Sequence, residues 1–176
     1  MAEILIALFL MNGIQLRLTT LFLILSLMAS AQRRESATST GNPLSENEKK
    51  RLLELVNEAR SKGCRCGSRK MPPVGAVLWD EQLETAAEKH SLDMARHKFM
   101  SHEGSDGSKF SARLTQAGFK WTSCAENIAE GYESVEKVVD AWLNSPPHCK
   151  NLMDPRSRFM GVARTGTYWT QDFGGK

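Results

Sequence analysis

The heptapeptide SHEGSDG, residues 101–107, decides the fold, because it ends the longest helical pattern of the chain and opens a polar, glycine-rich loop. Before it, apolar or small residues at positions 83, 86, 87 and 94 share one face of a helix that Asp80 can cap, together with His90. His90 lies in this stripe, where a histidine is most often a core residue hydrogen-bonded to backbone. His102, in contrast, stands in the loop itself and is the first candidate for a binding site.

Start and stop signals on both sides of this loop outline the remaining elements. A Ser45–Glu48 capping box opens the first helix, and Gly63 is a natural residue to end it. Together these signals place helices at about 45–63, 80–99, 108–118 and 134–145, and strands within 119–132, 160–164 and 167–173. Helices gathered around few strands, without regular βαβ spacing, indicate an α+β fold.

Two later stretches are expected to meet the heptapeptide in one cleft. AENIAEGY contributes Glu126, and WLNSPPHCKNLM contributes His148. With His102 they supply two imidazoles and one carboxylate from three separate segments. Such a set suits Zn²⁺ or another divalent cation and leaves a coordination position for water. The sequence therefore predicts a cleft, and a metal site, formed by His102, Glu126 and His148.

The N-terminus predicts export. An apolar run at residues 21–29 follows Arg17 and ends in the small-residue pattern Ala29-Ser30-Ala31. This is typical of a secretory signal peptide, so we expect residues 1–31 to be cleaved and the protein to be extracellular or periplasmic. A membrane anchor needs about 20 continuous apolar residues, which Arg17 interrupts, so no membrane span is expected in the mature chain.

Composition limits the partners. Residues 32–43 are polar and are typical of a disordered lead-in, which leaves one domain at 44–176. The formal net charge of +3 is nearly balanced, and no run of Lys and Arg appears, so the chain is not expected to bind nucleic acid. A monomer is expected, whose partner is an unknown small ligand, lipid or extracellular polymer.

The even number of cysteines predicts disulfides in an exported chain of this size. The four are Cys64, Cys66, Cys124 and Cys149. Bridging the first two would close a strained ring, so each should pair with Cys124 or Cys149, and both connectivities remain open. A zinc site is the alternative, but Cys-x-Cys without a second matched pair is poor zinc spacing.

The motifs, taken in order, resemble the CAP superfamily of cysteine-rich secretory proteins, antigen 5 proteins and pathogenesis-related proteins, and most closely its bacterial SCP-like secreted branch. The matching segments are LVNEAR, LxxAAxxHSxDM, SHEGSDG, AENIAEGY, WLNSPPHCKNLM and MGVA…YWTQDFG. The resemblance covers residues 53–174. It implies a three-layer α-β-α sandwich with a small antiparallel sheet between the helices and a cleft at one side.

The resemblance also implies specific residues. Family members carry two histidines and two glutamates in the cleft, and some bind a divalent cation there. His102, Glu126 and His148 match three of the four, while Asn144-Ser145 stands where the second glutamate would be. The bacterial pattern further implies a Cys66–Cys149 bridge, which would leave Cys64 for Cys124.

The first hypothesis is therefore a secreted, non-enzymatic or weakly enzymatic domain whose cleft binds a cation or small ligand, and three other interpretations remain open. A hydrogen-bonded His–Glu–His network could fix the three segments without metal. The protein could be an extracellular hydrolase, dependent on a metal or on a serine. The candidate serine is Ser145, three residues before His148, with Glu126 as orienter, although Ser145 could simply end a helix before two prolines. Trp169 with Tyr168 could line a lipid or sterol groove, although a core position is the simpler interpretation.

Overall fold

The computed structural model describes residues 43–176. The predicted signal peptide (1–31) and all but the last residue of the predicted lead-in (32–43) lie outside the described residues. From Pro43 to the C-terminus, no helix is both long and apolar enough to span a bilayer.

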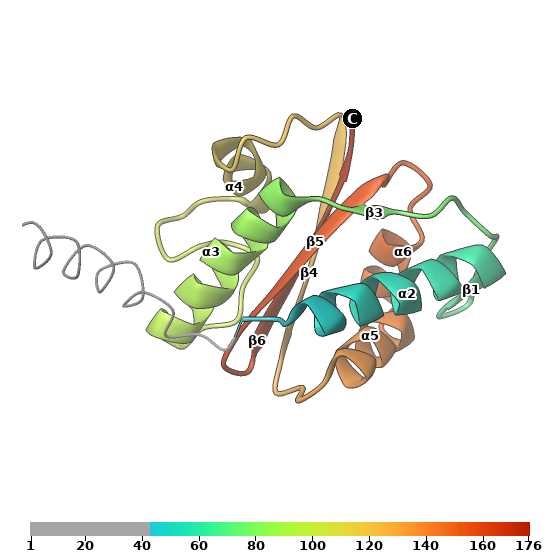
Figure 1. The fold of residues 1–176 in the computed structure, drawn as a ribbon, viewed down its shortest axis with the longest axis horizontal. Helices are drawn as coiled ribbons and strands as arrows, with labels where there is room; N and C mark the ends of the chain where they lie inside the picture. Colours follow the sequence, from blue (N-terminus) through green and yellow to red (C-terminus); the bar gives the residue numbers. More distant parts are fainter. Residues whose placement is uncertain (1–42) are drawn as a thin grey trace, which may run out of the picture. The chain divides into compact units, whose positions relative to one another are not determined.

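Helices and strands alternate irregularly along the described chain (Figure 1). The helices are α2 (Glu46–Lys62), α3 (Glu81–His97), α4 (Phe110–Gln116), α5 (Val135–Asn144) and α6 (Pro146–Leu152). The strands are β1 (Cys64–Cys66), β2 (Arg69–Met71), β3 (Leu78–Trp79), β4 (Ser123–Glu130), β5 (Phe159–Thr165) and β6 (Tyr168–Gly175).

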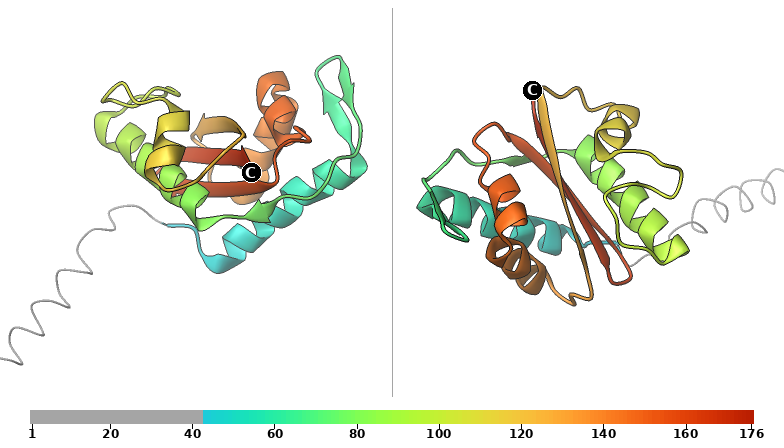
Figure 2. Two further views of the ribbon diagram at one scale, coloured as in Figure 1. Left: turned by 90° about the horizontal axis from the view of Figure 1, so that it is seen from above. Right: turned by 180° about the vertical axis from the view of Figure 1, so that it is seen from behind.

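A four-stranded sheet forms the middle layer, in the order β3-β5-β6-β4. Helices α3 and α4 cover one face, and α2, α5 and α6 cover the other, as the ribbon views show (Figures 1 and 2). The predicted α+β three-layer sandwich is thereby confirmed. The sheet is antiparallel except for β3, whose two residues pair in parallel with β5.

The helix boundaries follow the local signals that the sequence carries. The capping box at Ser45 and Glu48 is formed, and the Asp80 carboxylate accepts hydrogen bonds from two backbone N–H groups at the start of α3. Gly63 ends α2 with a φ of 70°, a value that favours glycine because it lacks a Cβ. In α4 the N-cap is Lys109 instead of the expected Ser108.

Besides the two-residue strand β3, the sequence did not predict a hairpin and a short helix. The segment after Gly63, expected to be a loop, forms the β1–β2 hairpin. Pro146 and Pro147 do end α5, but they also begin α6, because proline lacks only an N–H that the first turn of a helix leaves unpaired anyway. Helix α6 carries His148, one of the predicted site residues, and Cys149.

Gly161 sets the distance between α3 and the sheet. A Cβ at this position of β5 would lie 2.1 Å from the backbone nitrogen of Glu84 in α3, so any side chain would push the two apart. On this face the core includes Leu83, Ala86, Leu114 and Phe119, all buried. Close packing of α3 and α4 against the sheet fixes the two ends of the SHEGSDG loop.

Candidate functional site

Glu126 is the centre of the predicted cleft. It lies on β4 with its side chain fully buried, and both of its carboxylate oxygens are engaged. Oε1 lies 2.8 Å from Nδ1 of His102, and Oε2 accepts a hydrogen bond of 2.7 Å from the guanidinium of Arg113. Because Arg113 is also buried, its positive charge balances the carboxylate inside the protein.

Arg113 also holds the SHEGSDG loop from inside. From α4 its guanidinium donates to the backbone carbonyls of Ser108 (2.8 Å) and His102 (3.0 Å). His90 on α3 anchors the same loop, since its Nε2 lies 2.8 Å from the carbonyl oxygen of Ser101 and 3.9 Å from Glu126. The prediction that His90 is a core histidine bonded to backbone is confirmed.

The contact with Glu126 favours one tautomer of His102. An ionised carboxylate can only accept, so this contact is made by the tautomer that carries its proton on Nδ1. Nε2 is then left with its lone pair free, on a side chain that is 51% exposed. A histidine held in this way can bind a metal ion or accept a proton through Nε2.

Asn127, the next residue of β4, serves the other face of the sheet. Successive side chains of a strand point to opposite faces, so Asn127 faces α6 while Glu126 faces α3. Its amide donates to the backbone carbonyl of His148 (3.3 Å), and its oxygen accepts from Asn151 (2.9 Å). Two consecutive residues at the edge of the sheet thus hold the two histidine-bearing segments, one on each side.

His148 is half-buried on α6. Burial, and to a smaller extent the charge of nearby His102, lower the pKa of His148 below its ordinary value, which favours the neutral ring. The ligand atoms of His102, Glu126 and His148 do not all lie within 4.8 Å of one another; in residues 43–176 that spacing occurs only among three cysteines. Glu126 is thus committed to His102 and Arg113, and what links the two imidazoles is the effect of His102 on the pKa of His148.

Asp172 is a second buried acid that sequence reasoning missed, as it missed Arg113. It pairs directly with Glu126 across β4 and β6, so both side chains lie on the same face. Among residues 43–176, no N–H or O–H group donates a hydrogen bond to either carboxyl oxygen of Asp172. Burial, and then the negative charge of Glu126, raise the pKa of Asp172 well above its usual range, while Arg113 opposes this. In the sequence, Asp172 is only a single acidic residue within a strand that is otherwise buried. Its pairing with Glu126 depends on the register of β4 and β6.

Replacing Asp172 by Asn should stabilise the protein at neutral pH. Because the folded pKa of Asp172 is raised, the wild type loses stability as pH rises from about 4, and a non-ionising side chain escapes this loss. We expect little gain at pH 4, and a gain that grows by up to about 1.4 kcal/mol per pH unit above it. Urea unfolding of the wild type and Asp172→Asn at pH 4 and pH 7 measures this gain in the free energy of unfolding. Asp140→Asn, on the exposed side of α5, should change stability by less than about 0.5 kcal/mol at either pH; equal effects of both variants would contradict the prediction.

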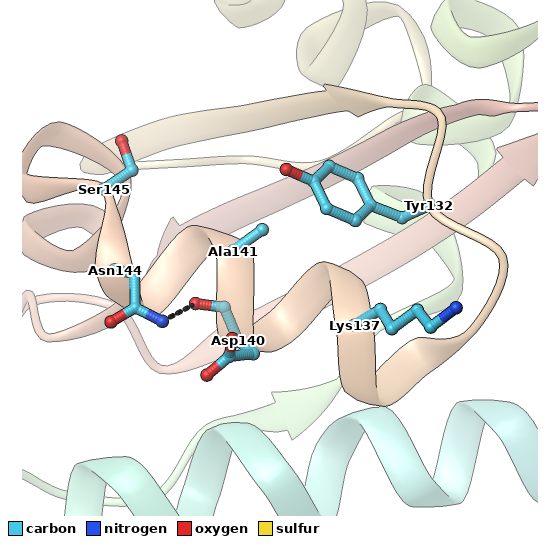
Figure 3. A pocket seen from close by; sticks show the side chains of 6 residues that line it. All are labelled: Tyr132, Lys137, Asp140, Ala141, Asn144 and Ser145. Atoms are coloured by element: carbon cyan, nitrogen blue, oxygen red, sulfur yellow. Dashed lines mark hydrogen bonds between the residues drawn. The ribbon is translucent and has the colours of Figure 1, made fainter.

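Ser145 lies between α5 and α6, as expected of a residue that ends a helix before two prolines. It borders a surface pocket of about 460 Å³, at the opposite end from Lys137 (Figure 3). Within residues 43–176 no hydrogen bond joins Ser145 to His148, and Glu126 orients His102 instead. The hydrolase hypothesis therefore remains a prediction from sequence alone.

Trp169 belongs to the core. It is fully buried, and its indole N–H donates to the backbone carbonyl of Tyr132 (2.8 Å). The guanidinium of Arg164 lies 4.9 Å from its ring centroid. The simpler interpretation of Trp169 is thus confirmed, and its ring does not line an open groove.

One of the two expected disulfides is present. Cys66 and Cys149 are bonded, which confirms the pairing that the family resemblance implied. Cys64 and Cys124 are free thiols, so the expected second bridge is not formed. The reason is their placement: Cys124 faces α3 and α4 from β4, whereas Cys64 lies in the hairpin beside α6, on the other side of the sheet.

The fold is an α-β-α sandwich in which the edge strand β4 holds the segments that carry His102 and His148. The model of the cysteine-rich secretory protein family (CAP) matches residues 53–173, and the chain belongs to this family. The uncharacterized protein YkwD of Bacillus subtilis is 34% identical over 151 residues, which cover 84% of this chain and 54% of YkwD. The uncharacterized membrane protein YlbC of the same organism is 29% identical over 124 residues, 70% of this chain and 33% of YlbC.

Solved structures show the same fold. An extracellular protein of Bacillus anthracis that contains an SCP domain matches with a TM-score of 0.65 and 26% identity, over 77% of this chain and 45% of that one. An outer surface protein of Borrelia burgdorferi also matches with a TM-score of 0.65, at 22% identity, over 77% of this chain and 98% of that one. The chain spans about half the length of YkwD and a third of YlbC, so it corresponds to one part of those proteins.

Proposed function

We propose that the protein is an exported binding module whose cleft takes a divalent cation such as Zn²⁺, or a small polar ligand, through His102 and His148. The observation that carries the proposal is the contact between Nδ1 of His102 and Glu126, since it leaves Nε2 free and aimed by a buried carboxylate. Pairs of this kind commonly support metal-binding histidines, because they fix the ring and raise the basicity of the other nitrogen.

Glu126 acquires a different role from the one expected from the sequence. Both of its oxygens already serve His102 and Arg113, so it is better suited to support a histidine than to bind the ion itself. His148 is favoured in the neutral state in which imidazole binds metals. The remaining coordination positions would be filled by water or by the ligand, which suits a binding site open to exchange.

Export is supported by the signal-peptide pattern in the sequence and by similarity to proteins described as extracellular or as an outer surface protein. An oxidising compartment is also consistent with the disulfide between Cys66 and Cys149. Detection of the protein in the culture medium or periplasm, with an N-terminus at residue 32, would test both cleavage and export.

Calorimetric titration with Zn²⁺ tests the site directly. It should be done in a Cys64→Ser, Cys124→Ser background, so that free thiols do not bind the ion. We expect binding at one site and a stabilisation of about 2.7 kcal/mol at a hundredfold excess over Kd. His102→Ala or His148→Ala should abolish both, and lowering the pH from 7.5 to 5.5 should weaken binding, because protons compete for the imidazoles.

His97→Ala is the matched control. His97 is an exposed histidine of α3 that contacts Asp93 outside the cleft, so its loss should leave binding unchanged. The proposal of a cation site fails if the Cys64→Ser, Cys124→Ser protein shows no saturable binding of Zn²⁺. It also fails if His97→Ala reduces this binding as much as His102→Ala and His148→Ala do.

A further inference from the structure

Three sulfur atoms meet where the β1–β2 hairpin packs against α6. Cys64 and Cys66 are two residues apart on β1, so their side chains share one face of the strand, opposite Cys149 on α6. The sulfur of Cys64 lies 3.5 Å from that of Cys149 and 4.0 Å from that of Cys66. A free thiol thus touches the only disulfide formed within residues 43–176.

We propose that Cys64, Cys66 and Cys149 form a thiol–disulfide exchange site, whose substrates are small thiols and disulfides. In the internal step the thiolate of Cys64 attacks the sulfur of Cys149. The Cys64–Cys149 bond forms, the Cys66–Cys149 bond breaks, and Cys66 leaves as a thiolate. Cys64 gives its proton to solvent and Cys66 takes one up, so the step needs no oxidant or reductant.

Because the Cys66–Cys149 bond is buried, Cys64 provides its route to thiols in solution. Cys66 is 2% exposed and Cys149 is 0% exposed, so an external thiol cannot reach their bond directly. Cys64 is only partly buried. Once the disulfide has moved to Cys64 and Cys149, one of its sulfurs is open to solvent. A small thiolate then attacks Cys64 and releases Cys149 as a thiolate, and a second thiol releases Cys64, giving the small-molecule disulfide and the reduced protein.

Loop-closure entropy does not distinguish the two disulfide isomers. The bridges Cys66–Cys149 and Cys64–Cys149 span 83 and 85 residues, and a loop-closure entropy that varies as the logarithm of length is nearly the same for both. The Cys64 sulfur now lies beside the bond and must move onto its axis to displace Cys66. β1 belongs to a separate two-stranded sheet, so this movement disturbs no strand of the central sheet.

Arg65 allows the two isomers to be told apart. Trypsin cuts after it and places Cys64 in peptide 63–65, Cys66 in peptide 66–69 and Cys149 in peptide 138–150. The full chain is incubated at pH 9, because burial raises the pKa of the Cys64 thiol, and free thiols are then blocked in acid before digestion. We expect 138–150 linked to both partner peptides, each in at least about a tenth of the molecules, since loop closure favours neither. A link from 138–150 to 66–69 alone, or a link between Cys64 and Cys124, overturns the proposal.

Reduction kinetics give a second readout, in a variant that starts with the native Cys66–Cys149 bridge. With reduced glutathione, the wild type should lose its disulfide at least about tenfold faster than Cys64→Ser, because the variant retains the buried bond without its route to solvent. Cys124→Ser, which removes the other free thiol, should react at the wild-type rate. Equal rates for the wild type and Cys64→Ser would refute a role for Cys64. Formation of a Cys64–Cys149 bond in Cys66→Ser supports it.

Discussion

Replacing Glu126 by Ala should destabilise the protein by about 3–5 kcal/mol, the usual cost of removing one partner of a buried ion pair. The guanidinium of Arg113 would remain buried without a counter-charge, and the ring of His102 would lose the acceptor that orients it. Chemical denaturation measures the loss. Glu130→Ala, at the exposed end of the same strand, is the matched control and should cost less than about 0.5 kcal/mol.

The loss in Glu126→Ala should also depend on pH. The charge of Glu126 helps to hold Asp172 protonated, so its removal lets Asp172 ionise at a lower pH and provide a negative charge near Arg113. The deficit relative to the wild type should therefore be smaller at pH 8 than at pH 5. In the double variant with Asp172→Asn this recovery should disappear. A deficit that is the same at both pH values, with or without Asp172, would mean that the two acids are not coupled.

Arg60→Met is expected to cost about 4 kcal/mol, although Arg60 lies far from the cleft in sequence. Its side chain on α2 is fully buried and donates to the backbone carbonyls of Gly75, Leu152, Asp154 and Ser157, at 2.7–3.1 Å. Methionine keeps much of the volume but removes the guanidinium donor from all four carbonyls. The carbonyl of Asp154 still accepts from the backbone N–H of Ser157 (3.2 Å), and each of the other three costs about 1–3 kcal/mol where water cannot reach it.

Two comparisons sharpen this prediction. Arg51→Met removes an exposed arginine of the same helix, which pairs with Glu136, and should cost less than about 1 kcal/mol. Arg60→Lys keeps a charge but not the planar fork, and should fall between the two. Hydrogen exchange should speed up in Arg60→Met at residues 152–157, where α6 ends. If Arg60→Met and Arg51→Met unfold at the same denaturant concentration, the bonds to the four carbonyls contribute nothing net.

The sequence predicted the elements whose signals are local. Capping residues such as Ser45 and Asp80 satisfy N–H groups within one turn, and the strand patterns near residues 123–130 and 159–175 were visible from alternation and turns. The three-layer arrangement and the Cys66–Cys149 bridge came from resemblance to a family, whose motifs retain long-range information that periodicity lacks.

What was missed depends on pairings across the chain. The role of Asp172 depends on its pairing with Glu126, 46 positions earlier in the chain. Arg113 lies in a helix of only seven residues, too short for a periodic pattern to show that its side chain points inward. The prediction of a second disulfide was wrong for a similar reason. The alternation of side chains along β4 places Cys124 on the face of the sheet opposite the hairpin that carries Cys64.

Glu126 and Asn127 are neighbours on β4 whose side chains point to opposite faces of the sheet. The support of both histidine segments therefore depends on the alternation of side chains along this strand. Deleting a single residue before Glu126 would turn the carboxylate toward α6 and the amide toward α3, and both histidine segments would lose their support at once. Deleting two residues would restore the facing of both side chains while moving each of them two positions along β6. Length changes in this family should thus be tolerated in the loops that flank β4, and inside the strand only in even steps.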